Sequence, residues 1–150
     1  MSRENDFYTR ITGDSTIMAL LTGGVYKAET VGIEGISREQ TPSAFDANGY
    51  LKPCCLVKQR GEIPDGTLLD PIAQVMSVSQ VVECWLYQDR LYTTIDSAGE
   101  RLKYLFIGYM FSDSFEIMWV NTLDRVRDKG ALKGCSMKKI DFQVKRVWTP

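Results

Sequence analysis

The feature that most constrains this chain is a change of hydrophobic period near residue 89. Between residues 74 and 88 the period is two, as in a β-strand. One face of that strand carries Met76, Val78, Val82, Cys84 and Leu86. From about residue 90 to 108 the apolar residues are spaced four and three apart, at Leu91, Ile95, Ala98, Leu102, Leu105 and Tyr109. This spacing predicts an amphipathic helix, which must bury its apolar stripe against the neighbouring sheet.

The segments on either side of this helix complete the predicted fold. Further strands are expected at residues 52–60, 114–127 and 135–148. Before them, short helices are expected at residues 3–12 and 15–22, the second capped by Asp14, followed by a brief extended piece at Val25 and Tyr26. The sequence therefore predicts an α+β fold with a mainly antiparallel four-stranded sheet. The order is β-β-α-β-β, with the N-terminal helices first and the helices packed on the sheet.

Length and composition favour one domain covering residues 1–150, because 44% of the residues are hydrophobic and can supply a core. Residues 27–50 show no sustained period, and we expect a long loop there. The polar start and the absence of a long apolar run predict neither a signal peptide nor a membrane span. The four cysteines are expected to be reduced thiols, with Cys54 and Cys55 pointing to opposite faces of a strand.

The sequence offers little for catalysis. The chain has no histidine, which excludes Ser-His-Asp and Cys-His arrangements and the commonest nitrogen ligand of zinc. Two carboxylate pairs remain, Asp65 with Asp70 and Glu34 with Glu39, but both lie among ordinary loop charges. No glycine-rich segment opens a helix after a strand, as a phosphate-binding loop requires. We therefore predict that the protein is not an enzyme and has no catalytic residue, cofactor or metal.

Two groups of apolar residues point to association with other chains. Val81, Trp85 and Tyr87 share the second face of the strand at residues 74–88, and aromatic residues are enriched at interface centres. The alternative is that the N-terminal helices cover this face. Ile63, Leu68, Leu69 and Ile72 lie in a connection rich in proline and glycine. These residues either dock on a neighbour or fold back over the core.

The end of the chain adds a third candidate surface. Arg125, Arg127 and Lys129 belong to a basic run near a turn, which either contacts an acidic partner or is a solvated hairpin tip. Trp148 stands where the alternation of the last strand shifts, which suggests a bulge or a strand that leaves the sheet. Residues 1–100 hold 8 basic and 14 acidic side chains, whereas residues 101–150 hold 10 and 5. The two parts either offset each other within one fold or attract neighbouring copies.

Three stretches resemble a known family. Residues 14–26 (DSTIMALLTGGVY) resemble the opening of small tail-terminator and tail-completion proteins of long-tailed phages, where a short helix ends at glycines before a Val-Tyr step. Residues 51–57 (LKPCCLV) resemble the proline and first strand of that family. Residues 81–87 (VVECWLY), with the helix that follows, are similar to its second strand and packed helix. The order of elements matches over nearly the whole chain.

The resemblance implies a structural subunit of the virion, assembled in the host cytoplasm. The expected assembly is a ring, usually of six copies, at the head-proximal end of the tail tube. Such a ring stops tube polymerisation and joins the tail to the head connector. The implied partners are other copies of the chain, the tail tube protein and the connector or stopper protein, while DNA crosses the lumen without being read. A head-completion or stopper protein, another neck subunit and a small ligand-binding α+β module remain as alternatives.

Overall fold

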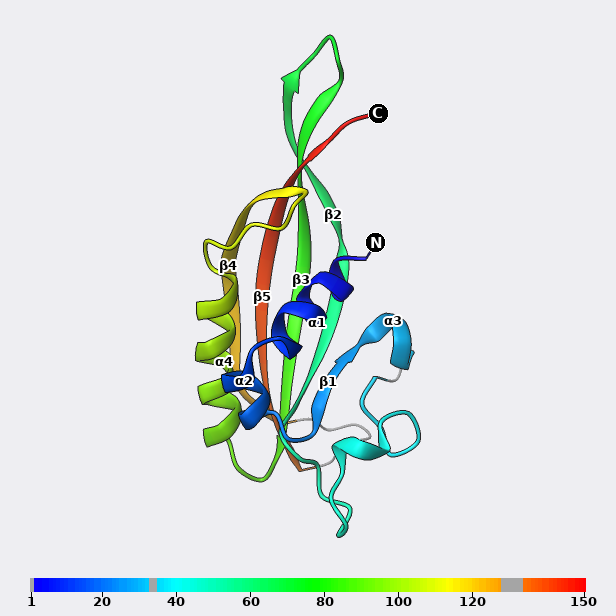
Figure 1. The fold of residues 1–150 in the computed structure, drawn as a ribbon, viewed down its shortest axis with the longest axis vertical. Coiled ribbons are helices and arrows are strands. Elements are labelled where there is room, and N and C mark those ends of the chain that lie inside the picture. Colours follow the sequence, from blue (N-terminus) through cyan, green and yellow to red (C-terminus); the bar gives the residue numbers. More distant parts are fainter. Residues whose placement is uncertain (1, 33–34, 128–133) are drawn as a thin grey trace.

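The computed structural model describes residues 2–32, 35–127 and 134–150. Its sheet has the strand order β1-β2-β3-β5-β4 (Figure 1). The strands are β1 (Gly24–Lys27), β2 (Cys54–Asp70), β3 (Val75–Asp89), β4 (Ser114–Arg127) and β5 (Cys135–Trp148). The helices are α1 (Arg3–Thr12), α2 (Ser15–Leu20), α3 (Ala28–Val31) and α4 (Thr93–Phe106), with one 3₁₀ turn at Pro42–Ala44.

The prediction of a four-stranded antiparallel sheet is wrong, because the sheet is mixed and has β1 as a fifth strand. β1 pairs in parallel with the start of β2, whereas every other pairing is antiparallel. The backbone approaches β2 closely at Gly23, whose amide donates to the Pro53 carbonyl at 2.8 Å. A Cβ at Gly23 would lie 2.9 Å from that same oxygen, so only glycine fits here. Four residues are too few to show a period, which is why the sequence indicated only an extended piece.

One face of the sheet carries the main core and is covered by α1, α2 and α4. Phe7 of α1 stacks on Phe106 of α4 with ring centroids 4.1 Å apart, and both rings contact Phe142 of β5. Most of the predicted α4 stripe is buried here, at Ile95, Ala98, Leu102 and Leu105. Leu91 is exposed because it precedes the helix. The stripe and the strand face at Val82, Cys84 and Leu86 therefore meet, as the change of period predicted.

The other face is covered near β1 by the segment between β1 and β2. A second cluster joins Val31, Ile36, Ala44 and Leu51 of this segment to sheet residues Cys54, Leu56 and Tyr87. The sequence predicted a long loop here but did not predict that it covers the sheet. The apolar residues of this segment follow neither a helical nor a strand period, so nothing in the pattern indicated their burial. Cys54 lies in this second cluster and Cys55 in the main core, so the prediction that they face opposite ways is confirmed.

The helix α4 begins later than predicted. Asp89, which directly precedes the predicted start of the helix, is still in β3 and pairs with Cys135 of β5. The chain then turns through Arg90, whose φ of 57° is left-handed, and helical structure starts at Thr93. Gln88 takes over part of the capping role, since its side-chain oxygen accepts a hydrogen bond from the Ile95 amide at 3.2 Å. Asp14 does cap α2 as predicted, accepting from the Ile17 amide at 3.0 Å.

A long hairpin projects from the body of the fold. The sequence predicted a turn-rich connection at residues 61–71, but β2 continues through it to Asp70 with shifts of register after Gln59 and Pro64. These irregularities let proline and glycine stay in a strand. Figure 1 shows the hairpin extending beyond the rest of the chain, with the C-terminus at its base. Residues 61–75 are called the arm below.

Candidate assembly surfaces

The arm exposes all four apolar residues that the sequence singled out in it. Ile63, Leu68 and Leu69 are exposed, and Ile72 at the tip keeps 97% of its surface open to solvent. No element of the described structure folds over them, so the alternative of a loop packed back on the core does not hold within one chain. Exposed aliphatic side chains on a projecting hairpin form a surface suited to a partner.

The arm is also acidic, and its three carboxylates differ in their partners. Glu62 accepts a hydrogen bond from Arg146 of β5 at 2.9 Å. Asp65 accepts from the hydroxyls of Ser77 and Ser79 at 2.6 and 2.8 Å, which lowers its pKa. Asp70 accepts from the backbone amides of Ile72 and Ala73, and no lysine or arginine among the described residues pairs with it. The tip of the arm therefore carries an uncompensated negative charge.

The predicted patch of Val81, Trp85 and Tyr87 is divided by the fold. Tyr87 is buried in the second core cluster, and Trp85 is half-buried with its ring stacked on Tyr87 at 6.4 Å. Val81 is half-buried further toward the arm. The N-terminal helices do not cover these residues, because they pack on the opposite face; the segment after β1 covers part of the patch instead.

The remaining predicted interface residues lie toward the two ends of the sheet. Trp148 pairs in regular register with Met76 at the base of the arm and is exposed, so no bulge separates it from the sheet. Arg125 and Arg127 belong to β4, and Lys129 lies outside the described residues. The described structure therefore adds Trp148 to the exposed apolar surface near the arm.

Two surfaces were missed by the sequence analysis, and the first is the outer edge of β4. This strand pairs only with β5 in the described sheet, and it exposes Phe115, Trp119, Val120 and Leu123. The Lys103 ammonium lies 4.1 Å from the centroid of the Trp119 ring. Apolar residues on both faces of residues 115–123 were visible in the sequence, but an edge strand cannot be told from a central one by such a pattern.

The second missed surface is a groove between α1, α4 and the connection that leads to β4. It has a volume of about 740 Å³, and its walls include Asp6, Thr9, Arg10, Arg101, Tyr104, Leu105, Tyr109 and Phe111. Tyr104 is exposed at the rim. The groove combines residues about a hundred positions apart in the chain, which no local sequence pattern indicates.

The charges around the groove are paired except at one side chain. Arg101 binds Asp14 with two hydrogen bonds of 2.7 and 3.0 Å, and these lower the pKa of Asp14. Arg3 pairs with Asp6 at 2.9 Å and with Asp113 at 2.8 Å. Burial raises the pKa of Asp6, while the hydrogen bond from Arg3 lowers that of Asp113.

Arg10 is the exception. Its guanidinium lies 3.4 Å from the centroid of the Tyr109 ring, and its Nε donates to the Leu105 carbonyl at 2.7 Å. No carboxylate among the described residues forms an ion pair with it. The stacking and the hydrogen bond hold the guanidinium in a fixed orientation, so its terminal nitrogens remain available to an anionic group.

The two cysteines at the start of β2 have thiols of low reactivity. The hydrogen bond with Cys84 and burial raise the pKa of the Cys55 thiol, and burial raises that of Cys54, so both are poor nucleophiles. No group of three or more Cys, Asp or Glu side chains in the described ranges is placed to hold a metal ion. Nor does any helix of these ranges have the length and apolar character needed to cross a membrane.

Comparisons with known proteins find a likeness in fold but no match in sequence. No family model matches the chain, and no curated protein matches its sequence. Among solved structures, the fold is similar to a chain of the virion of a native gene transfer agent particle, with a TM-score of 0.62. The alignment covers 98% of this chain and 96% of that chain at 13% sequence identity. At this identity the likeness shows a shared fold, which extends over essentially the full length of both chains.

Proposed function

We propose that this chain is a structural subunit of a phage-like virion and forms a ring at the head-proximal end of the tail tube. The observation that carries the proposal is the likeness in fold to a chain of a gene transfer agent virion, which covers 98% of this chain. The sequence resemblance to tail-terminator proteins at residues 14–26, 51–57 and 81–87 supports the specific position. The ring stops the growth of the tube and connects it to the head, with six copies as the expected number.

The distribution of surfaces supports a ring. A closed ring requires two different patches on each copy, one that fits the other on the next copy. This chain has an exposed, acidic and aliphatic arm at one end of its sheet. On the body it has the exposed edge of β4 and the groove around Arg10. These patches are chemically different, so contacts between unlike patches are favoured over symmetric pairing of two copies.

The proposed role is structural and not enzymatic, and it requires no cofactor. A chain without histidine and with deeply buried cysteines supplies few groups for acid–base or nucleophilic chemistry. In the proposed ring, DNA crosses the lumen without sequence readout. The proposed partners are further copies of the chain, the tail tube protein and the head connector.

The test is to purify the full chain and measure its mass in solution by light scattering, alone and with tail tube subunits from the same virion. The expected result is a ring visible by electron microscopy and located at one end of assembled tubes. Binding to the portal adaptor without binding to tube ends would assign the chain to the stopper position instead. A monomer at the highest soluble concentration that binds neither partner would contradict the virion proposal itself.

A further inference from the structure

We propose that the groove around Arg10 receives the tip of the arm from the next copy, with the Asp70 carboxylate facing the Arg10 guanidinium. The proposal rests on the proposed ring and specifies the contact that closes it. It commits the groove to one occupant, a second copy of this chain. The argument uses the position of the two surfaces, their charges and their apolar residues.

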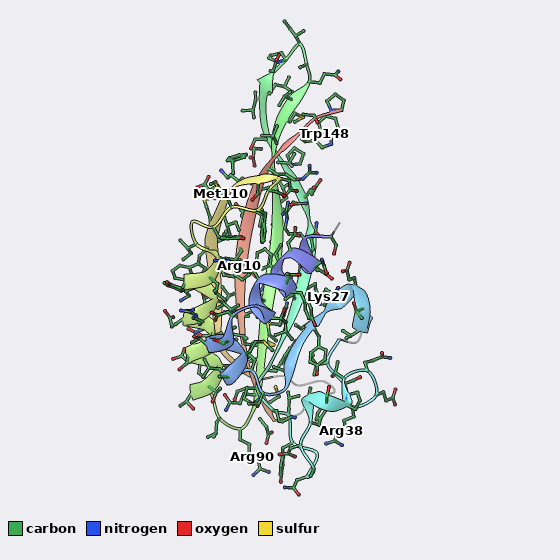
Figure 2. All side chains as sticks on the ribbon, in the orientation of Figure 1. Arg10, Lys27, Arg38, Arg90, Met110 and Trp148 are labelled. Carbon is green, nitrogen blue, oxygen red and sulfur yellow. The ribbon has the colours of Figure 1, made fainter. Side chains whose placement is uncertain are left out.

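The position of the two surfaces excludes a contact within one chain. Figure 2 shows Arg10 on α1 over the body of the sheet, while the arm projects from one end, beyond Trp148. The strands of the arm are continuous with β2 and β3 of the body and stay paired along most of their length. An arm held in this way cannot fold back into its own groove, so any arm that fills the groove belongs to another molecule.

The charges of the two surfaces are complementary. Residues 61–75 contain three acidic side chains and no basic one. Glu62 already has Arg146, and Asp65 has two serine hydroxyls, which leaves Asp70 at the tip without a cation. In the groove, Asp14 and Asp6 form ion pairs with Arg101 and Arg3, whereas Arg10, whose charge also helps to lower the pKa of Asp14, forms no ion pair with a described residue. Each surface therefore carries one charged side chain that forms no ion pair within the described part of its own chain, and the two side chains have opposite charges.

The apolar parts of the two surfaces also match. Leu69 directly precedes Asp70 and Ile72 follows it after Pro71, and both apolar side chains are exposed. The groove offers the rings of Tyr104, Tyr109 and Phe111 around Arg10. Its volume of about 740 Å³ lies within the range of roughly 300–1,000 Å³ typical of binding clefts, which suits a hairpin tip. Aromatic walls around an oriented arginine are the kind of centre that dominates binding at interfaces.

A charge exchange tests the proposal. Arg10→Asp and Asp70→Arg, each alone, place like charges together and should raise the concentration for half-maximal assembly by about tenfold or more. Combining both changes in one chain restores an opposite pair and should recover most of the assembly. Asp70→Asn keeps an oxygen for the amides of Ile72 and Ala73 but removes the charge, so it should weaken assembly less than Asp70→Arg.

Arg90→Asp is the matched control, since Arg90 is exposed at the opposite end of the body (Figure 2) and the change in charge is the same. It should leave assembly unchanged. The midpoint of urea unfolding is measured for every variant, so that loss of assembly is separated from loss of folding. Rings that form normally with Arg10→Asp, or a double variant that fails to recover although it is folded, would overturn the arm-and-groove contact and leave the proposed ring intact.

Cross-linking provides a test that does not depend on charge. One batch carries Ile72→Cys and another carries Tyr104→Cys; the four native thiols are buried and should not react. After mixing and treatment with a short bismaleimide, the expected product joins an Ile72→Cys chain to a Tyr104→Cys chain. Dimers within either batch alone should be at least about tenfold rarer, because an arm meets a groove and never another arm. Equal yields of all pairs, or none in samples that contain rings, would reject the contact.

Discussion

The body of the sheet and the arm are built from the same two strands, β2 and β3, and differ in what covers them. In the body, Val57 and Val82 are fully buried under the helices, and Leu56 is buried under the segment that follows β1. In the arm the ladder of backbone hydrogen bonds continues, but Ile63, Leu69 and Ile72 remain exposed. Strand pairing alone therefore does not indicate where folding energy is gained, because that gain comes from apolar burial.

This difference separates two roles within one hairpin. Residues of the body maintain the fold, whereas apolar residues of the arm contribute almost nothing to the stability of a single chain. An exposed strand with aliphatic side chains is a liability for an isolated protein, because it promotes aggregation. Its presence here is explained if a partner covers it, which is the role that the proposed ring assigns to it.

Truncation of the main core should have the largest effect. Phe7 is fully buried and contacts the rings of Phe106, Phe111 and Phe142. Phe7→Ala is expected to lower the free energy of unfolding by about 3–5 kcal/mol, because it removes the ring and leaves a cavity between α1, α4 and the sheet. Urea unfolding followed by circular dichroism measures the change. Phe7→Leu, which fills most of the space, should cost clearly less, and an equal cost for both variants would contradict a packing role.

The contact between α4 and β5 permits a second test within the body. The side chain of Lys138 passes beneath Gly99 and reaches Asp96 at 2.8 Å and Asp124 at 3.2 Å. A Cβ at Gly99 would lie 2.8 Å from the Lys138 Cε. Although burial lowers the pKa of Lys138, its hydrogen bonds to the two aspartates raise it above its ordinary value, so the side chain stays charged and fixed.

Gly99→Ala should therefore destabilise the native chain by about 1 kcal/mol, although alanine is the better helix former. Lys138→Ala alone should cost about 1–2 kcal/mol, since Asp96 and Asp124 remain hydrated when their partner is lost. In the Lys138→Ala background the cost of Gly99→Ala should fall, because the lysine stem is gone and the tight contact that remains is with the Ile140 Cδ1, 3.1 Å from the new Cβ. The four unfolding free energies form a double-mutant cycle. Additive effects would show that Lys138 does not determine the fit at Gly99.

The sequence predicted the body far better than it predicted the arm or the groove. The α4 stripe and the buried face of β3 follow a period, and β4 and β5 have the predicted bounds, because a buried face imposes regular spacing on its residues. β1 was missed as a strand because it has four residues and pairs with β2 across an intervening segment of the chain. The number of strands therefore depended on a non-local contact that leaves no periodic signal.

The candidate surfaces were also predicted incompletely, because they too depend on contacts between distant parts of the chain. The exposed aliphatic residues of the arm were recognised from their setting among proline and glycine, but their place on a projecting hairpin was not. Tyr87 was selected as an interface residue from its strand face, and the segment of residues 28–53, which has no period of its own, buries it. The groove needs Arg10 and Tyr109 to meet across the fold, so only the tertiary structure could identify it.

Acid should weaken the body through its surface carboxylates, with an effect smaller than that of core truncation. Hydrogen bonds from Arg101, Arg3 and Tyr92 lower the pKa values of Asp14, Asp113 and Asp124, respectively, below 3.8. A carboxylate whose pKa is lower in the folded chain than in the unfolded chain adds stability above about pH 4 and loses it as the pH falls through the folded pKa. Asp6 acts in the opposite sense, because burial raises its pKa.

The expected result is a urea midpoint that falls as the pH is lowered from 6 toward 3. Asp14→Asn should reduce the slope of this dependence, since asparagine can still cap α2 but no longer titrates. Arg101→Gln should reduce the slope as well, by removing the partner that lowers the pKa of Asp14. A slope unchanged in both variants would show that this ion pair does not contribute to the acid sensitivity of the body.

The smallest effect on folding is expected at the tip of the arm. Ile72 is 97% exposed, so Ile72→Ser removes almost no buried surface and should change the free energy of unfolding of a dilute, monomeric sample by no more than about 0.5 kcal/mol. Leu91→Ser, at an exposed leucine of the body, is the matched control and should behave alike in this measurement. The two variants should differ in assembly, which Ile72→Ser weakens and Leu91→Ser does not. If Ile72→Ser destabilised the monomer as much as a core truncation does, the arm would be part of the folding unit, and the distinction between a covered body and an uncovered arm would fail.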